Sequence, residues 1–274
     1  MWLLPIFLGS LLPLLSVQPL NLVRHGKPVL DIRNFPYVAF LDDPRGHCTG
    51  SLLNSRYVLT AAHCALGIER KKKVFVYAGT VDPPGKLTPG YQKKAVRGAV
   101  VHPGFTMASS ANDIAVIEID PMTKSDYVNF VQIYADDHFA TGPKNQSALL
   151  VGWGANFDSY QKQTLQYGFT SIFNDNQKCE QLWTEYCKET GKCSLKVVAT
   201  DNDICTQGTA AMTVGDSGGP LMSFNSKTGQ WGQIGTASCG FGGNPPDVWI
   251  RTSRYCDFLS KATKGTFNCV TSVT

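Results

Sequence analysis

The chain has 274 residues, of which 43% are hydrophobic and 17% charged, and its 25 lysines and arginines stand against 21 aspartates and glutamates. This composition is that of an ordinary globular protein, and a net charge of +4 gives no strong case for a nucleic-acid partner. A chain of this length can bury the core of one large β domain or of two smaller ones.

The first segment along the chain is an apolar stretch over residues 3–15, followed by Ser16. It is too short to span a bilayer, and Pro5 and Pro13 disfavour a persistent membrane helix. We interpret residues 1–16 as a secretory signal peptide. No later stretch is long and apolar enough for a membrane anchor, so we expect a secreted, extracellular protein.

Short β-rich segments recur between glycine, proline and asparagine residues, and helix signals are scarce before residue 250. The helix signals predict a helix over 253–263, where Tyr255, Phe258 and Leu259 fall at helical spacing, and a shorter one over 176–186. The pattern indicates an all-β fold, built as an antiparallel barrel or sandwich. The predicted strands are 37–41, 51–53, 57–59, 74–78, 95–101, 114–119, 148–151, 166–172, 221–224 and 233–236.

Two surface features leave alternatives open. The densest basic run, Arg-Lys-Lys-Lys at 70–73, is either a solvated loop face or a contact for heparin-like or acidic surfaces. The acceptor sequence Asn145-Gln146-Ser147 either carries a glycan or forms a bare loop.

The chain contains nine cysteines, which in a secreted protein indicate an oxidising compartment and a disulfide framework. Because nine is an odd number, at least one thiol is free or is paired outside the chain.

Three separate motifs carry the chemistry. The sequence Gly-Asp-Ser-Gly-Gly-Pro-Leu at 215–221 places Ser217 on a turn where backbone N–H groups can converge on an anion. A serine hydroxyl needs a base and an oxyanion site to act as a nucleophile. The sequence Leu-Thr-Ala-Ala-His-Cys at 59–64 supplies His63, and Asn-Asp-Ile-Ala-Val-Ile at 112–117 supplies Asp113.

These motifs, in the order His, Asp, Ser, resemble those of the trypsin and chymotrypsin family of serine endopeptidases, from about residue 23 to about residue 259. The resemblance implies two antiparallel six-stranded β-barrels with a C-terminal α-helix, and an active site in the cleft between the barrels. The resemblance implies one peptidase domain over residues 23–274. Within it we expect a first barrel over about 23–130, a second barrel over about 131–252, and a C-terminal helix and tail over 253–274.

The resemblance also implies the role of each site residue. Ser217 attacks a peptide carbonyl, His63 takes its proton and passes it to the leaving amine, and Asp113 orients the imidazole. The N–H groups of Gly215 and Ser217 form the oxyanion hole. Ser238 lies where the family keeps a serine that hydrogen-bonds the triad carboxylate.

Substrate preference is expected to depend on Ala211, Ser238, Gly240 and Asp247, which the resemblance places around the primary specificity pocket. Trypsin-like members carry an aspartate where this chain has Ala211 at the pocket base. Asp247 falls on the opposite wall, where a buried carboxylate would attract lysine or arginine. The alternative is that Asp247 caps a turn after Pro246 and faces water. The hypothesis is mixed specificity with some preference for basic residues.

Two departures from the family concern activation and the pocket. The resemblance implies that Val23 is the new N-terminus after cleavage and that its ammonium pairs with Asp216, which would make residues 17–22 a short propeptide. The residue before Val23 is Leu22 in place of a lysine or arginine. Thr213 replaces a cysteine that normally clamps the specificity pocket, so we expect looser pocket walls. Cys239 stands where an aromatic residue usually flanks the substrate cleft.

The resemblance implies the disulfides Cys48–Cys64 and Cys179–Cys205. Cys187 and Cys193 lie in an apparent insertion and can pair with each other. The sequence does not assign the remaining three cysteines, Cys239, Cys256 and Cys269.

The function predicted is that of a secreted serine endopeptidase that forms an acyl-enzyme on protein or peptide substrates. It needs no cofactor and no metal, is open to protein protease inhibitors, and is expected to be a monomer. The alternative is a secreted protease homologue that acts by binding, through the basic face at 70–73. An α/β-hydrolase esterase does not fit, because its triad ends in histidine and its sheet alternates with helices.

Overall fold

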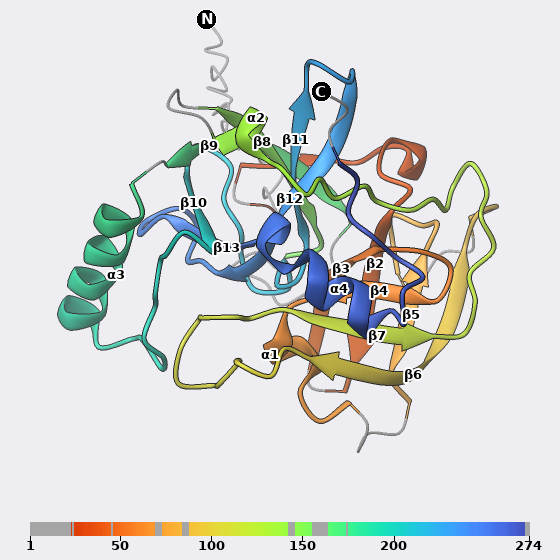
Figure 1. The fold of residues 1–274 in the computed structure, drawn as a ribbon, viewed down its shortest axis with the longest axis horizontal. Coiled ribbons are helices and arrows are strands. Elements are labelled where there is room, and N and C mark those ends of the chain that lie inside the picture. The colour runs from red at the N-terminus through yellow and green to blue at the C-terminus, as the bar shows by residue number, and fades with distance from the viewer. Residues whose placement is uncertain are drawn as a thin grey trace, which may run out of the picture.

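The computed structural model describes residues 23, 25–44, 46–68, 73–83, 88–141, 146–154, 164–173 and 175–271. The predicted signal peptide and propeptide, residues 70–72 of the basic run and the acceptor Asn145 lie outside the described residues. The described chain forms two β-barrels with few helices (Figure 1).

The first barrel is closed, and its strands follow each other in the order β2-β3-β4-β7-β6-β5. Most of its strands are apolar and buried at successive positions, because one face points into the barrel and the other packs on neighbouring elements. The core inside contains Leu41, Leu52, Val58 and Ile117, each at most 2% exposed. The strand bounds are β2 Val38–Asp43, β3 Gly46–Leu52, β4 Tyr57–Thr60, β5 Phe75–Ala78, β6 Gln92–Val101 and β7 Ala115–Ile119.

The second barrel follows the order β9-β10-β13-β12-β11-β8 and closes where β8 pairs with β9. A short strand, β1, adds to β9 through the pair Lys27 and Tyr167. Residues 27–28 therefore join the second barrel, although the sequence assigned them to the range of the first. The strand bounds are β1 Lys27–Pro28, β8 Ser147–Gly152, β9 Gln166–Phe173, β10 Asp203–Gln207, β11 Pro220–Asn225, β12 Gln230–Cys239 and β13 Asp247–Arg251.

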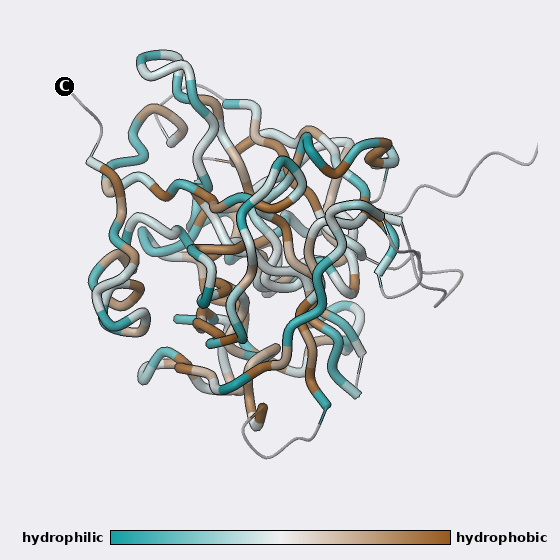
Figure 2. The backbone as a smooth tube through the Cα atoms, turned by 90° about the vertical axis from the view of Figure 1, so that its right-hand side faces the viewer, coloured by the Kyte–Doolittle hydropathy of each residue, from teal (hydrophilic) through white to brown (hydrophobic). Residues whose placement is uncertain are grey.

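A shared hydrophobic cluster joins the two barrels and the C-terminal helix. It contains Leu59 and Val116 of the first barrel, Val151 and Met222 of the second, and Leu259 of α4, all buried. Brown, hydrophobic stretches of the tube run through the interior of the molecule (Figure 2). This packing holds the loops of the two barrels in a fixed relation.

The helices are short apart from α3, which lies at the edge of the second barrel away from the first (Figure 1). The side chain of Asp175 caps the N-terminus of α3 by accepting a hydrogen bond from the N–H of Lys178 at 2.8 Å, and Gly191 ends the helix with φ 64°. The helix bounds are α1 Ala62–Ala65, α2 His138–Thr141, α3 Asn176–Thr190 and α4 Cys256–Ala262, with 3-10 turns at Ile32–Asn34 and Thr252–Tyr255.

The predicted fold class, two six-stranded antiparallel barrels with a C-terminal helix, is confirmed. Every strand predicted from the sequence is present, although β3 begins five residues before the predicted start at 51, while β1, β10 and β13 were not predicted. The helix predicted over 176–186 runs one turn further, to Thr190. Among the described residues, no helix combines the length and the apolar character needed to cross a membrane.

The structure contains four disulfides and leaves Cys239 as a thiol. The two pairings implied by the family resemblance are present, and so is the bridge within the insertion. The fourth bridge, which the sequence did not assign, closes the C-terminal segment onto α4. The pairs are Cys48–Cys64, Cys179–Cys205, Cys187–Cys193 and Cys256–Cys269.

Candidate active site

His63 and Asp113 meet at the edge of the first barrel. His63 is the second residue of α1, and Asp113 lies two residues before β7. Nδ1 of His63 lies 2.7 Å from Oδ2 of Asp113, and the backbone N–H of His63 donates to Oδ1 at 2.9 Å. The carboxylate therefore fixes both the ring and the backbone of the histidine.

Asp113 is held from the second barrel as well. The hydroxyl of Ser238 donates to Oδ2 of Asp113 at 2.8 Å. The Asp113 side chain is 4% exposed, whereas that of His63 is 30% exposed. Because a carboxylate only accepts hydrogen bonds, Nδ1 of His63 carries the proton, and Nε2 is left to accept one. This is the tautomer that a general base requires.

The loop that carries Ser217 is a tight turn built on glycines. The N–H of Asp216 donates to the carbonyl of Thr213 at 3.0 Å, and that of Gly219 donates to the carbonyl of Asp216 at 2.8 Å. Gly218 has φ 80°, and a Cβ there would come within 2.7 Å of the backbone nitrogen of Ala61. Only glycine fits this close approach of the two barrels.

Ser217 lies against the helix turn that carries His63. Sγ of Cys64, the next residue after the histidine, is 3.8 Å from the carbonyl oxygen of Ser217. No hydrogen bond joins the Ser217 hydroxyl to His63 among the described residues. In unliganded enzymes such bonds are commonly long and shorten when substrate binds.

The N–H groups of Gly215 and Ser217 have no acceptor within the described part of the chain. Gly215 is buried and has φ 103°, and Ser217 is half-buried. Buried N–H groups are almost always paired in folded proteins, so a pair without acceptors on one turn marks a place where an anion can bind. These are the two donors that the sequence predicted.

Asp216 points into the protein, away from this site. Its carboxyl group is 2% exposed and accepts hydrogen bonds from the N–H groups of Gly154 and Thr213, each at 2.8 Å. Burial raises the pKa of Asp216 to about 6, against the opposing effect of these donors. Val23, the predicted new N-terminus, is fully buried in the second-barrel cluster that also contains Ala210.

Asp247 is buried in the wall of the predicted specificity pocket. It is 1% exposed, as is Ala211, so the alternative in which Asp247 faces water is wrong. Oδ2 accepts the N–H of Met212 at 2.7 Å, whereas Oδ1 has no regular hydrogen-bond partner among the described residues. Burial raises the pKa of Asp247 well above its usual range. Burial favours the neutral carboxyl, whereas a donor or cation bonded to Oδ1 would favour the charged form.

Gly240 faces Asp247 and Met212 at close range. A Cβ on Gly240 would overlap Cγ of Met212 and Oδ1 of Asp247. The N–H of Gly242 donates to the carbonyl of Met212 at 3.1 Å, and this bond joins the two pocket walls near Thr213. Met212 was not singled out from the sequence, since a methionine one residue after Ala211 carries no signal of its own.

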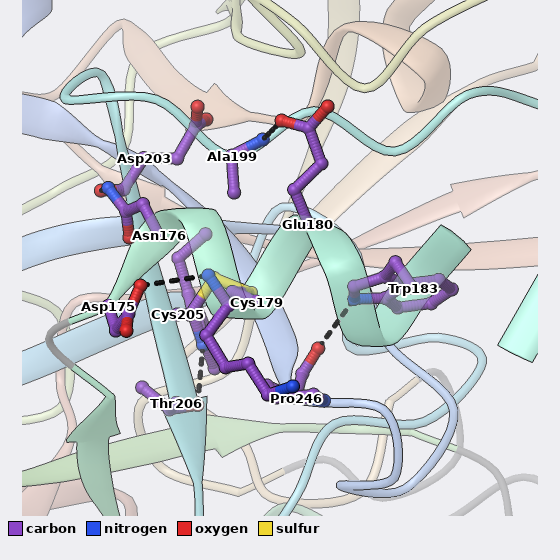
Figure 3. Close-up of a disulfide and its surroundings, with 12 residues drawn as sticks. Asp175, Asn176, Cys179, Glu180, Trp183, Ala199, Asp203, Cys205, Thr206 and Pro246 are labelled. Atoms are coloured by element: carbon purple, nitrogen blue, oxygen red, sulfur yellow. Dashed lines mark hydrogen bonds between the residues drawn. A yellow bond between two sulfur atoms is a disulfide. The ribbon is translucent and has the colours of Figure 1, made fainter. Parts of the chain in front are cut away.

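Helix α3 braces the same pocket wall from outside (Figure 3). The indole N–H of Trp183 donates to the carbonyl of Pro246 at 2.8 Å. The disulfide Cys179–Cys205 ties α3 to β10, and Thr206 of β10 pairs with Asp247 of β13.

Cys239, the free thiol, lies beside the site and is half-buried. Burial, together with the charges of Asp113 and Asp247, raises the pKa of this thiol to about 12. A thiol with so high a pKa is a poor nucleophile at neutral pH.

The described residues contain one His/Cys cluster with metal-like spacing, formed by Cys48, His63 and Cys64. Both cysteines are bridged to each other, and His63 Nδ1 is bonded to Asp113. A metal needs thiolate and free imidazole ligands, so this cluster does not fit one.

The clotting factor G beta subunit of Tachypleus tridentatus is 29% identical over 80% of this chain and 71% of its own length. The CLIP domain-containing serine protease B9 of Anopheles gambiae is 28% identical over 73% of this chain and 53% of its own length. The phenoloxidase-activating enzyme 1 of Spodoptera litura is 29% identical over 86% of this chain and 65% of its own length.

The matched region thus spans between about half and 71% of the lengths of these relatives. A family model described as Trypsin matches residues 26–259, which is most of the chain. The chain belongs to the trypsin family of serine proteases.

Proposed function

We propose that the protein is a secreted serine endopeptidase that hydrolyses peptide bonds through an acyl-enzyme on Ser217. The observation that carries this proposal is that a bonded histidine–aspartate pair and a pair of N–H groups without acceptors are both present. The imidazole of His63 is bonded to a buried carboxylate that Ser238 also holds, and two N–H groups without acceptors lie on the turn of Ser217.

In the first half of the reaction, Oγ of Ser217 attacks the carbonyl carbon of the scissile peptide bond. Nε2 of His63 accepts the hydroxyl proton and then donates it to the leaving amine as the C–N bond breaks. Asp113 stabilises the imidazolium that forms. In the second half, water takes the place of the amine and releases the acid product.

The N–H groups of Gly215 and Ser217 stabilise the oxyanion of each tetrahedral intermediate. Each such donor is worth on the order of 3 kcal/mol of transition-state stabilisation. Because neither group is engaged in the described chain, no existing bond has to break when the substrate arrives.

Specificity is mixed, with a preference for lysine or arginine on the amino side of the scissile bond. Oδ1 of Asp247, which has no regular hydrogen-bond partner among the described residues, supports this preference, because a buried carboxylate is stabilised best by a cation that bonds to it. The Met212 side chain packs against Gly240 at the predicted pocket wall. Because a thioether side chain is flexible, it can move aside when a substrate side chain enters.

Activation requires cleavage after Leu22, which frees the ammonium of Val23 to pair with Asp216. Two features support this step. The side chain of Val23 is already buried in the second barrel, and the buried carboxyl of Asp216 has a raised pKa that a nearby cation would lower. N-terminal sequencing of the mature secreted protein tests the cleavage site, and a mature chain that begins elsewhere contradicts it.

Secretion is supported by the apolar segment at 3–15 and by four disulfides, which persist in oxidising compartments. The partners are protein substrates and protein inhibitors of proteases, and the chain acts as a monomer. Relatives named as a clotting factor subunit and a phenoloxidase-activating enzyme support a role in cleaving other proteins.

A homologue that acts by binding is the second candidate, and one observation favours it. Met212 and Asp247 pack so closely against Gly240 that even a Cβ at this position would overlap both side chains. Digestion of a peptide library separates the two functions. Cleavage that disappears in Ser217→Ala establishes the peptidase, whereas intact peptides with the correctly processed chain favour the binder.

A further inference from the structure

We propose that Thr49, on β3 of the first barrel, is a positioning residue that holds the oxyanion hole in shape. This inference rests on the proposed peptidase function. It concerns a residue whose side chain is fully buried and to which the sequence motifs gave no role.

Thr49 bonds to the carbonyl oxygens of both residues that supply the oxyanion donors. Its hydroxyl donates to the carbonyl of Gly215 at 2.9 Å, and its backbone N–H donates to the carbonyl of Ser217 at 2.9 Å. The carbonyl of Gly215 shares its peptide plane with the N–H of Asp216, and the carbonyl of Ser217 shares its plane with the N–H of Gly218. Thr49 therefore restrains the peptide unit that lies between the two oxyanion donors and the one that follows the second donor.

The direction of the Thr49 hydroxyl proton is set by its other neighbour. The backbone N–H of Trp153 donates to Oγ1 of Thr49 at 3.3 Å. Since that N–H cannot accept a proton, the single hydroxyl proton of Thr49 is free for the carbonyl of Gly215. The hydroxyl is thus satisfied on both sides in a buried location.

A second side chain closes the space beside Gly215. Nε2 of His47 lies 2.8 Å from the carbonyl oxygen of Trp153, and the ring stacks on Phe40 with centroids 5.0 Å apart. A Cβ on Gly215 would overlap Nε2 of this ring and lie 3.0 Å from Cδ2. Gly215 is confined between the imidazole of His47 and the hydroxyl of Thr49.

The restraint from the hydroxyl matters because Gly215 has φ 103° and no side chain of its own to limit its rotation. The backbone N–H of Thr49 survives any side-chain change at this position, but the hydroxyl does not. Removing the hydroxyl releases the Gly215 carbonyl and leaves the Ser217 carbonyl bound. The N–H of Gly215 is then less well aligned with the oxyanion, which lowers kcat. KM is unaffected, because this N–H acts in the chemical step.

The experiment compares Thr49→Val, which keeps the shape and removes the hydroxyl, with Thr49→Ser, which keeps the hydroxyl. Thr252→Val is the matched control, because Thr252 is also fully buried and donates its hydroxyl to a backbone carbonyl, that of Gln233, at 3.0 Å. All variants are processed after residue 22 and studied at equal folded fraction.

We expect Thr49→Val to lower kcat about tenfold or more with KM within twofold, and Thr49→Ser to stay within threefold of the parent. Thr252→Val should leave both constants within twofold. Hydrogen exchange gives a readout that does not need activity. The hydrogen-bonded amides of Asp216, Gly218 and Gly219 should exchange at least tenfold faster in Thr49→Val than in Thr49→Ser or Thr252→Val.

Equal exchange of these three amides in Thr49→Val and Thr252→Val overturns the inference, and so does a kcat that falls equally in both. If the parent protein cleaves no substrate, the proposed peptidase function fails. The exchange comparison then still decides whether Thr49 holds the loop.

Discussion

The indole N–H of Trp183 donates a hydrogen bond to the carbonyl oxygen of Pro246 at 2.8 Å, which anchors α3 to the residue that precedes Asp247. Trp183 is 1% exposed and packs on Phe241, with ring centroids 5.6 Å apart. The longest helix of the described chain thus supports the predicted specificity pocket through this side chain as well as through the Cys179–Cys205 disulfide.

Replacing Trp183 by phenylalanine should lower the free energy of unfolding by about 2 kcal/mol, because the Pro246 carbonyl loses its partner in a buried location. Urea unfolding measures the change. Trp231→Phe is the control, because Trp231 is 43% exposed and should change stability by less than about 0.5 kcal/mol. Equal effects of the two substitutions would show that the bond to Pro246 contributes nothing.

Asp247→Asn keeps the size of the side chain and removes its charge. We expect kcat/KM for substrates with arginine before the scissile bond to fall at least tenfold, because the guanidinium loses its charged partner. The same constant for phenylalanine substrates should stay within threefold. A panel of matched peptides measures the ratio, and an unchanged arginine preference removes Asp247 from the account of specificity.

Asp113→Asn should lower kcat by about four orders of magnitude, the loss known for the family's template enzyme, because the amide favours the wrong imidazole tautomer. Ser238→Ala removes one of the hydrogen bonds to the same carboxylate and should cost roughly tenfold. Steady-state kinetics on one peptide substrate measure both. A larger loss in Ser238→Ala than in Asp113→Asn would contradict the assignment of Asp113 as the group that orients His63.

The stability of the uncleaved chain should decrease from about pH 4 to pH 6. Burial raises the pKa of Asp203 and of Asp216 from 3.8 to about 6, so in this window the folded state keeps protons that the unfolded state has lost. The free energy of unfolding therefore falls as the pH rises, by up to about 1.4 kcal/mol per pH unit for each group.

Asp203→Asn isolates one of these groups. Its amide oxygen can still accept from Thr200, whose N–H and hydroxyl bond to the Asp203 carboxyl at 2.8 and 2.9 Å. Urea titration at several pH values measures the free energy of unfolding of both proteins. The value for the variant minus the value for the parent should rise between pH 4 and 6 and stay constant below pH 4. A difference that does not depend on pH would show that Asp203 titrates normally.

The strands and the three catalytic motifs could be found because each is encoded locally, whereas the two-barrel arrangement was implied by the family resemblance. Strands such as 57–59 and 114–119 are compact apolar runs between turn residues, and His63, Asp113 and Ser217 stand in short motifs of their own. The strand β13 was not predicted, since it directly follows Pro245 and Pro246, which signal a turn.

The contacts that hold the predicted specificity pocket and the turn of Ser217 could not be predicted, because they join residues far apart in the chain. The Trp183 bond to Pro246 spans 63 positions, and the Thr49 bond to Gly215 spans 166. A threonine in a strand and a tryptophan in a helix usually pack in a core, so neither residue shows its role in the sequence.

Labelling of Ser217 by a fluorophosphonate, followed by mapping of the modified peptide, tests the central claim most directly. The reagent forms a tetrahedral phosphorus adduct, so it needs the nucleophile, the base and the oxyanion donors together. With the chain processed after Leu22, we predict one label per molecule at Ser217 and at least a hundredfold slower labelling in His63→Ala. No modification of Ser217 in the processed protein, or equal labelling rates with and without His63, would contradict the account.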